Sequence, residues 1–165
     1  MNMMKRIVLT LLLMQIVSAA DISASDKDDV SSVLDHLHLY ASEANSIKYF
    51  SLFTNGAIYI GTDADETWNM KHFKDFAHPY FSKGKGWTYT SNNRHIYFSQ
   101  SKQTAWFDEM LFNESYGETR GTGVLIKSDN GWKISQYHLA FPIPNKVVKQ
   151  VVKIIKDNKI VKSKK

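Results

Sequence analysis

The chain has 165 residues, the size of one domain, with 43% apolar and 13% aromatic residues, enough for a packed core, so a disordered chain is excluded. The formal net charge of +5 is unevenly distributed, because residues 21–145 hold 11 basic and 15 acidic residues whereas residues 146–165 hold eight lysines and one aspartate. The globular part is therefore mildly acidic, which argues against a nucleic-acid partner.

The first twenty residues predict a secretory signal peptide. "MNMMKR" is a short basic segment, "IVLTLLLMQIV" is an apolar run, and "SAAD" offers small residues to a signal peptidase. The apolar run is short for a membrane span, which needs about 20 residues, and a retained N-terminal anchor is the alternative. We expect cleavage after Ala19 or Ala20 and a periplasmic or secreted protein. The chain has no cysteine and hence no disulfide.

Helical periodicity dominates the first part of the mature chain. An amphipathic helix is predicted to start at its N-cap, Asp26, because apolar residues follow at helical spacing: Val30, Val33, Leu34, Leu37 and Ala41. "SIKYFSLF" predicts a short second helix and "AIYI" a strand. "MKHFKDFAHPYF" predicts a third helix, which Pro79 should kink or break near His78.

Apolar and polar residues alternate from Trp87 to Phe141, with turn-forming segments "SNN", "SQSKQ", "NESYG" and "SDNG" between the runs. This pattern predicts an antiparallel meander. Helices followed by such a meander predict an α+β fold in which the helices cover one face of a curved sheet. We expect one domain over residues 21–145.

Residues 146–165 predict a basic amphipathic helical tail. Valines and isoleucines from Val147 to Ile155 make one helical stripe, and lysines occupy the other faces. Three interpretations remain open: a helix docked on the body or on a partner subunit, a helix lying on an anionic membrane surface, and a disordered segment.

The last hairpin suggests a cavity. A three-residue loop in "SDNGW" would pair Thr122 with His138 and Val124 with Gln136. The same sheet face would begin with Trp132 near the turn and become polar further away. A face that changes from apolar to polar along one strand is typical of a cavity that opens at one end.

Charged residues on neighbouring strands are candidates for chemistry at this cavity. Arg120 would share the face of His138, and adjacent Asp108 and Glu109 would point to opposite faces, so that one of them reaches the cavity. A carboxylate there is either a general base or half of a structural ion pair. The candidate catalytic residues are therefore His138, Asp108, Glu109 and Arg120.

Aromatic residues would line the cavity walls, as is usual in small-molecule sites. The candidate ligand-binding residues are Gln136, Thr122, Trp106, Tyr80 and Trp68. We expect no metal and no cofactor, because no histidine pair has metal-ligand spacing and no glycine-rich nucleotide fingerprint is present.

Four segments carry a resemblance to a known family: "YFSLFTNGAIYIGTDADETW", "HPYFSKGKGWTYT", "AWFDEML" and "RGTGVLIKSDNGWKISQYHLAFPIPN". Together they resemble the SnoaL-like branch of the nuclear transport factor 2-like superfamily over roughly residues 28–146. The resemblance implies a cone, in which a strongly curved antiparallel sheet wraps around N-terminal helices, and a homodimer formed through the sheet. It also implies that Arg120 and His138 occupy positions from which family members present polar groups to the cavity.

Three functions are compatible with this resemblance, because one fold serves many activities. The first is binding of a small, partly apolar molecule without chemistry. The second is proton-transfer catalysis of the isomerase, dehydratase or cyclase type, with Asp108 or Glu109 as base and with His138 and Arg120 stabilising an oxyanion. The third is a dimeric interaction module that recruits a partner or a membrane through its sheet or its tail.

Overall fold

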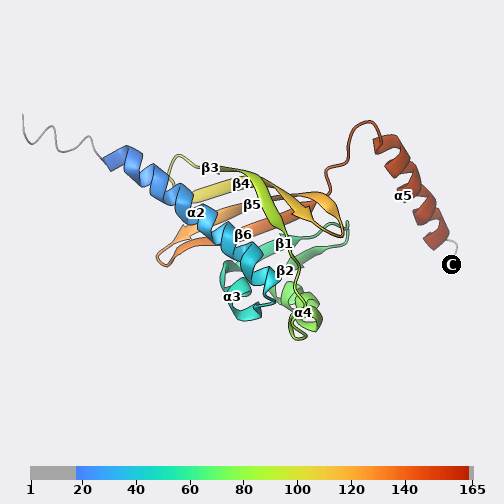
Figure 1. Ribbon diagram of the computed structural model, residues 1–165, viewed down its shortest axis with the longest axis horizontal. Coiled ribbons are helices and arrows are strands. Elements are labelled where there is room, and N and C mark those ends of the chain that lie inside the picture. Colours follow the sequence, from blue (N-terminus) through green and yellow to red (C-terminus); the bar gives the residue numbers. More distant parts are fainter. Residues whose placement is uncertain (1–17, 164–165) are drawn as a thin grey trace, which may run out of the picture.

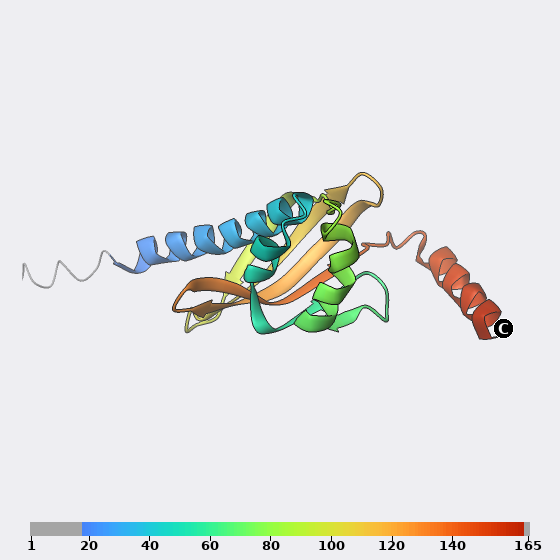
Figure 2. The ribbon, with the colours of Figure 1, turned by 90° about the horizontal axis from the view of Figure 1, so that it is seen from below.

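The computed structural model describes residues 18–163, with side chains from 25 to 158, as a curved sheet with helices on one face (Figures 1 and 2). The predicted signal peptide lies outside the described residues except for Ser18 to Ala20. The elements are α2 (Ser18–Ser42), α3 (Ser46–Ser51), β1 (Phe53–Ile60), β2 (Thr67–Asn69), α4 (Met70–Phe81), β3 (Thr90–Phe98), β4 (Thr104–Asn113), β5 (Gly117–Ser128), β6 (Gly131–Ala140) and α5 (Val148–Ser163). Within residues 18–163, no helix is both long and apolar enough to cross a membrane.

Helix α2 packs along the sheet with the predicted apolar stripe buried, but it does not begin at Asp26. Asp26 lies inside the helix and is only 4% exposed. Its carboxylate accepts hydrogen bonds from the Lys127 ammonium and from the indole of Trp132. The Lys127 hydrogen bond holds the pKa of Asp26 below its usual range. Asp26 therefore makes a tertiary contact and does not cap the helix.

The two following helices begin at asparagine caps. Asn45 Oδ1 accepts from the Lys48 amide at 3.2 Å, and Asn69 Oδ1 accepts from the His72 amide at 3.0 Å. Helix α4 passes Pro79 without a break and ends at Phe81. Because Pro79 stands in the last turn, its missing amide removes a hydrogen bond only where the helix is about to end.

The sheet is mixed, with strand order β2-β1-β6-β5-β4-β3. Strands β3 to β6 form the predicted antiparallel meander. The prediction of a wholly antiparallel sheet is wrong in one place. Strand β1 lies parallel to β6 and pairs Tyr59 with Tyr137. This pairing supplies hydrogen-bond partners for the edge of β6, which the meander alone would leave open.

The hairpin between β5 and β6 differs from the prediction near its turn. Its loop has two residues, because Ser128 pairs with Gly131. A bulge at Ser135 then restores the predicted pairs, Thr122 with His138 and Val124 with Gln136. A bulge adds one residue to a strand and so reverses the faces beyond it.

We call the sheet face under the helices the inner face and the opposite one the outer face. The core lies on the inner face, where Trp132 and Ile134 are buried before the bulge and Tyr137 and Leu139 after it. Gln136 and the half-buried His138 therefore point to the outer face. The prediction that Trp132 and His138 share one face is wrong for this reason.

Candidate functional site

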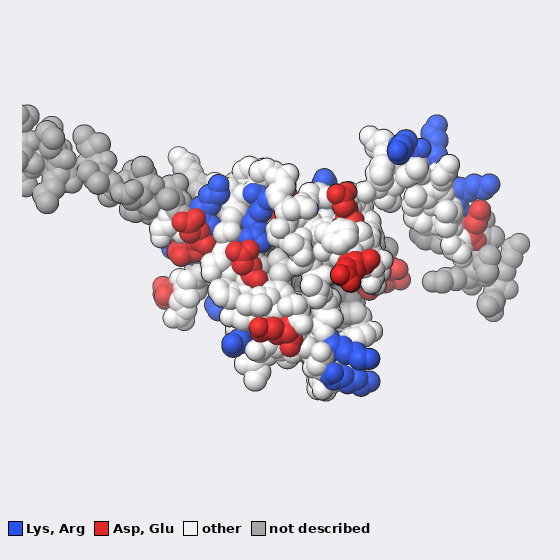
Figure 3. All heavy atoms as spheres, viewed as in Figure 1, with Lys and Arg blue, Asp and Glu red and all other residues white. Residues whose placement is uncertain are grey.

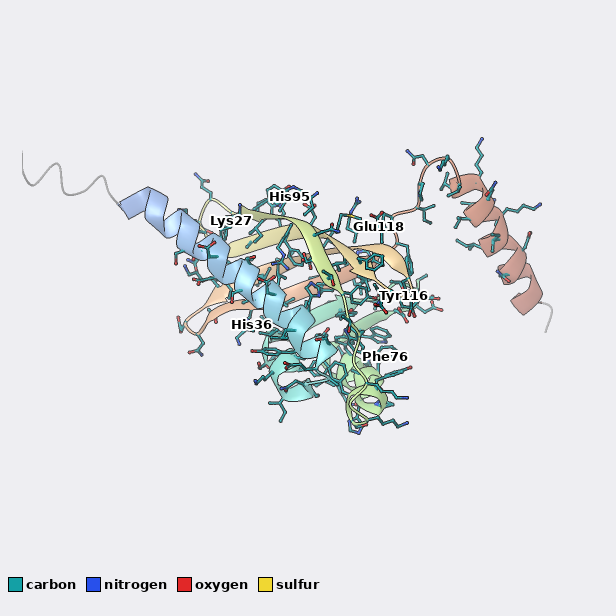
Figure 4. The ribbon with its side chains drawn as sticks, viewed as in Figure 1. Lys27, His36, Phe76, His95, Tyr116 and Glu118 are labelled. Atoms are coloured by element: carbon teal, nitrogen blue, oxygen red, sulfur yellow. The ribbon has the colours of Figure 1, made fainter. Side chains whose placement is uncertain are left out.

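A cavity of about 260 Å³ opens at one end of the sheet, beside α4. Eight of its lining residues have aromatic side chains, and they come from elements far apart in the sequence. Figure 4 labels two of them, Phe76 on α4 and Tyr116 in the β4–β5 turn, at the same end of the molecule. The lining residues are Tyr59, Gly61, Thr62, Glu66, Trp68, Phe73, Phe76, Tyr80, Trp87, Tyr89, Tyr116 and Leu139.

Stacked rings hold the cavity wall in place. The ring centroids of Tyr59 and Phe73 are 3.8 Å apart with an angle of 17° between the planes. Trp68 stacks on Phe76 with centroids 4.5 Å apart. Phe73 is buried, whereas Phe76 is 39% exposed at the rim. Rings fixed against one another leave a flat, apolar surface that suits an aromatic ligand.

The polar groups of the cavity are phenols, one threonine and one carboxylate. Burial raises the pKa of Tyr59. It also raises the pKa of Tyr89, which is less deeply buried. Both therefore stay protonated at neutral pH and can donate hydrogen bonds to a ligand oxygen. Glu66 stands in the β1–β2 loop, which is closed by a hydrogen bond of 2.8 Å from the Gly61 amide to the Glu66 carbonyl.

A small recess of about 10 Å³ adjoins the cavity and shares Tyr59, Trp87, Tyr89 and Leu139 with it. The recess is also lined by His38, whose side chain is 12% exposed. The recess has room for about one water molecule. The cavity therefore adjoins a recess that is lined by the His38 imidazole.

Behind the recess lies a buried ionic cluster centred on Glu109, whose side chain is 0% exposed. Glu109 Oε1 accepts from His38 Nε2 at 2.8 Å, and Oε2 accepts from Ser91 Oγ and from Arg94 Nε, both also at 2.8 Å. Burial opposes the charge of Glu109, but the bonds from His38 and Arg94 outweigh it and lower the pKa of this carboxyl. Glu109 is therefore ionised at neutral pH.

Arg94 ties this cluster to α2. Its Nη1 donates to Asp35 Oδ1 at 2.7 Å and to the carbonyl and hydroxyl oxygens of Ser31 at 3.0 and 2.9 Å. The nearby charges of Glu109 and Asp35 raise the pKa of Arg94 despite its burial. The cluster therefore joins the helix to β3 and β4 across the core.

The structure separates the candidate site residues into two groups. Trp68 and Tyr80 line the cavity, and Glu109 points to the inner face behind it. The remaining candidates lie on the outer face, away from the cavity: His138, Asp108, Arg120, Gln136, Thr122 and Trp106.

On the outer face the candidates do not form the expected set of interactions. Asp108 is 42% exposed and accepts from His95 Nδ1 at 3.1 Å and from the Tyr97 hydroxyl at 3.4 Å. Arg120 is exposed and stands across from Met110 on β4. The cation that pairs with the strand carboxylate is thus Arg94, from β3.

Sequence reasoning missed His38, although a signal for it was present. His38 extends the apolar stripe of Val30, Leu34, Leu37 and Ala41 at helical spacing, so it had to face the core. Tyr59 was also missed; it alternates with Ala57 on the inner face of β1. Among residues that the structure describes, no group of three or more His, Asp or Glu side chains could hold a metal ion.

Solved structures with the same fold share little sequence with this chain. A proposed dehydratase of the nuclear transport factor 2-like family from Streptomyces avermitilis has a TM-score of 0.63 and 11% identity, with 73% of this chain and 99% of that chain covered. A proposed scytalone dehydratase from Novosphingobium aromaticivorans has a TM-score of 0.62 and 11% identity, with 74% and 88% covered. A protein of unknown function from Pseudomonas putida has a TM-score of 0.62 and 8% identity, with 76% and 92% covered.

These likenesses establish a nuclear transport factor 2-like fold. No functionally curated protein matches the sequence. The family model of the SnoaL-like domain matches residues 30–144, which run from the first core residue of α2 to the segment after β6. The chain therefore belongs to the SnoaL-like domain family.

Proposed function

We propose that this protein binds a small, partly apolar molecule in the cavity beside α4. The observation that carries the proposal is the cavity of about 260 Å³ whose walls are stacked aromatic rings and whose polar groups include phenols, one threonine and one carboxylate. Such a site favours a flat molecule of one or two rings, which is smaller than a drug-sized ligand. A ligand oxygen would accept from the Tyr59 or Tyr89 hydroxyl.

Replacement of Trp68 with alanine should weaken binding of the probe 2-naphthol by at least tenfold, because the indole forms part of the wall and stacks on Phe76. Binding is measured by isothermal titration calorimetry. The matched control is Trp106→Ala, which removes the same side chain from the outer face, and its affinity should stay within about twofold of the parent. Equal losses in both variants, or no binding by the parent, would contradict the proposal.

Native mass spectrometry of gently purified protein gives an independent test. A retained molecule of defined mass, absent from the Trp68→Ala variant, is the expected result. A parent protein that never carries extra mass and never binds aromatic probes would rule out this ligand class.

A second candidate function is proton transfer on the bound molecule, and the adjoining recess with His38 favours it. Because His38 Nε2 donates to the ionised Glu109, Nδ1 is the ring nitrogen that would accept a proton. His38 would then be the general base and Glu109 the residue that positions it. This arrangement replaces the set expected from the sequence, because Asp108, Arg120 and His138 lie on the other face of the sheet.

We also propose that the outer face joins two copies of the chain. Tyr97 and Trp106 stack there with centroids 6.0 Å apart, and they are 45% and 44% exposed. Ile126, at 42%, extends this apolar surface. Aromatic residues of this kind dominate the energy of many protein interfaces.

Substitution of Trp106 by glutamate should weaken dimer formation by roughly a hundredfold, because a charge would be placed in the middle of the apolar surface. Sedimentation velocity over a range of protein concentrations measures the effect. Tyr80→Glu is the control, since Tyr80 is similarly exposed but lies at the cavity rim. A parent chain that is monomeric throughout would disprove this interface.

A further inference from the structure

Helix α5 stands clear of the rest of the molecule. Both ribbon views place it beyond the end of the sheet (Figures 1 and 2), joined to β6 by residues 141–147. The SnoaL-like match ends at residue 144, before the helix begins. Helix α5 is therefore an addition to the family domain, and the cavity is complete without it.

The helix has two distinct sides. At 100° per residue, the five apolar residues from Val148 to Ile155 fall on one continuous arc, whereas Lys149, Lys153 and Lys156 fall on the opposite one. The apolar arc is open to solvent: Ile154 is 60% exposed, Ile155 48% and Val152 43%. An exposed apolar side of this size indicates a surface that binds another molecule.

The charge of the tail argues against the packing of α5 on the α5 helix of a second copy. Residues 146–165 carry eight lysines and one aspartate, so two copies of α5 would repel each other. Figure 3 shows lysines along α5, while acidic side chains are scattered over the visible body. A helix with an apolar side and a lysine side is the form that lies in the interface of an anionic bilayer, with its lysines near the headgroups.

We propose that α5 docks this protein onto an anionic phospholipid surface. Its valines and isoleucines enter the boundary between headgroups and acyl chains, and its lysines remain at the level of the phosphates. The body between residues 21 and 145 has 11 basic and 15 acidic residues, so the anionic surface repels it and leaves the cavity accessible. This proposal is independent of what the cavity binds.

Co-flotation of the full chain with lipid vesicles tests the proposal. The vesicles contain phosphatidylglycerol and phosphatidylcholine in equal parts, or phosphatidylcholine alone. We expect binding to the anionic vesicles to be at least about tenfold stronger and to weaken at high salt, where the Debye length falls to ~3 Å at 1 M. The parent and all variants contain residues 1–20. Differences in lipid binding between them therefore come from the substituted residues.

Two variants of α5 should each reduce binding to the anionic vesicles by about tenfold or more. Ile155→Glu places a charge in the middle of the apolar arc, and the double variant Lys149→Glu with Lys153→Glu reverses the polar side. Ile47→Glu is the matched control, because Ile47 is 86% exposed on α3, which both ribbon views show well apart from α5 (Figures 1 and 2). The thermal unfolding midpoint of the body should be the same in all of them.

Two results would overturn the proposal. Equal binding by the parent and the α5 variants would show that α5 does not contact lipid. A change in sedimentation of Ile155→Glu without vesicles would show that the apolar arc is covered by a second copy.

Discussion

Replacement of Glu109 with glutamine is expected to lower the free energy of unfolding by about 3–5 kcal/mol. Glu109 is completely buried, and its two oxygens accept hydrogen bonds from His38, Ser91 and Arg94. Glutamine has nearly the same shape, but it lacks the charge and has only one acceptor oxygen. The buried guanidinium of Arg94, 11% exposed, would lose its main counter-charge in the core.

The neighbouring residue provides a matched control. Asp108 is 42% exposed on the outer face, so Asp108→Asn should change stability by no more than about 0.5 kcal/mol. Urea unfolding of both variants at neutral pH measures the difference. Similar losses for Glu109→Gln and Asp108→Asn would mean that burial of the Glu109 cluster does not determine the stability of the fold.

The pH dependence of stability follows from the same carboxylate. The pKa of Glu109 is lower in the folded protein than its ordinary value of 4.5. Its contribution is therefore fully present above that ordinary value and is lost as the pH falls through the folded pKa. The pKa of Asp26 is also lowered in the folded protein, so its contribution to stability is likewise lost as the pH falls. In Glu109→Gln, the acid-induced loss of stability should be smaller than in the parent.

A second large effect is expected for His38 if the cavity performs proton transfer. We expect His38→Gln to slow exchange of the α-hydrogens of 2-tetralone, a bicyclic ketone, by about 10²–10⁴-fold in deuterium oxide. Glutamine can still donate a hydrogen bond to Glu109, so the buried cluster keeps its partner, but it cannot accept a proton at neutral pH. Proton NMR follows the exchange directly.

The control for this experiment lies on the same helix. His36 bonds to the Ser32 carbonyl one turn earlier at 2.8 Å and is not among the residues that line the cavity or the recess. His36→Gln should therefore exchange at the parent rate. If His38→Gln also exchanged at the parent rate while both variants bound 2-naphthol normally, the protein would be a binding protein without this chemistry.

Local patterns predicted much of the fold. The apolar stripe from Val30 to Ala41, the meander from β3 to β6 and the amphipathic tail all depend on periodicity within one segment. Each was predictable because the chain must bury one face of each element. The two asparagine caps, Asn45 and Asn69, belong to the same class of local feature.

The faces of the strands were less predictable. Both alternating sets of β4 are largely apolar, with Trp106 and Met110 flanking Asp108, and Phe107 and Leu111 flanking Glu109. The sequence therefore could not say which carboxylate points inward. The bulge at Ser135 reversed the expected faces of β6, and no glycine or proline marks it in the sequence.

The sequence by itself determined the α+β class, the family resemblance, the apolar stripes and the charged tail, because these depend on spacing along one chain segment. Only the tertiary structure decided where the site lies. It brought together Tyr59, Trp68, Phe76 and Tyr116, and it placed His38 against Glu109 across 71 residues of sequence. Such contacts depend on strand register and on how helices pack over the sheet, and a shift of one residue in a strand moves every side chain to the other face.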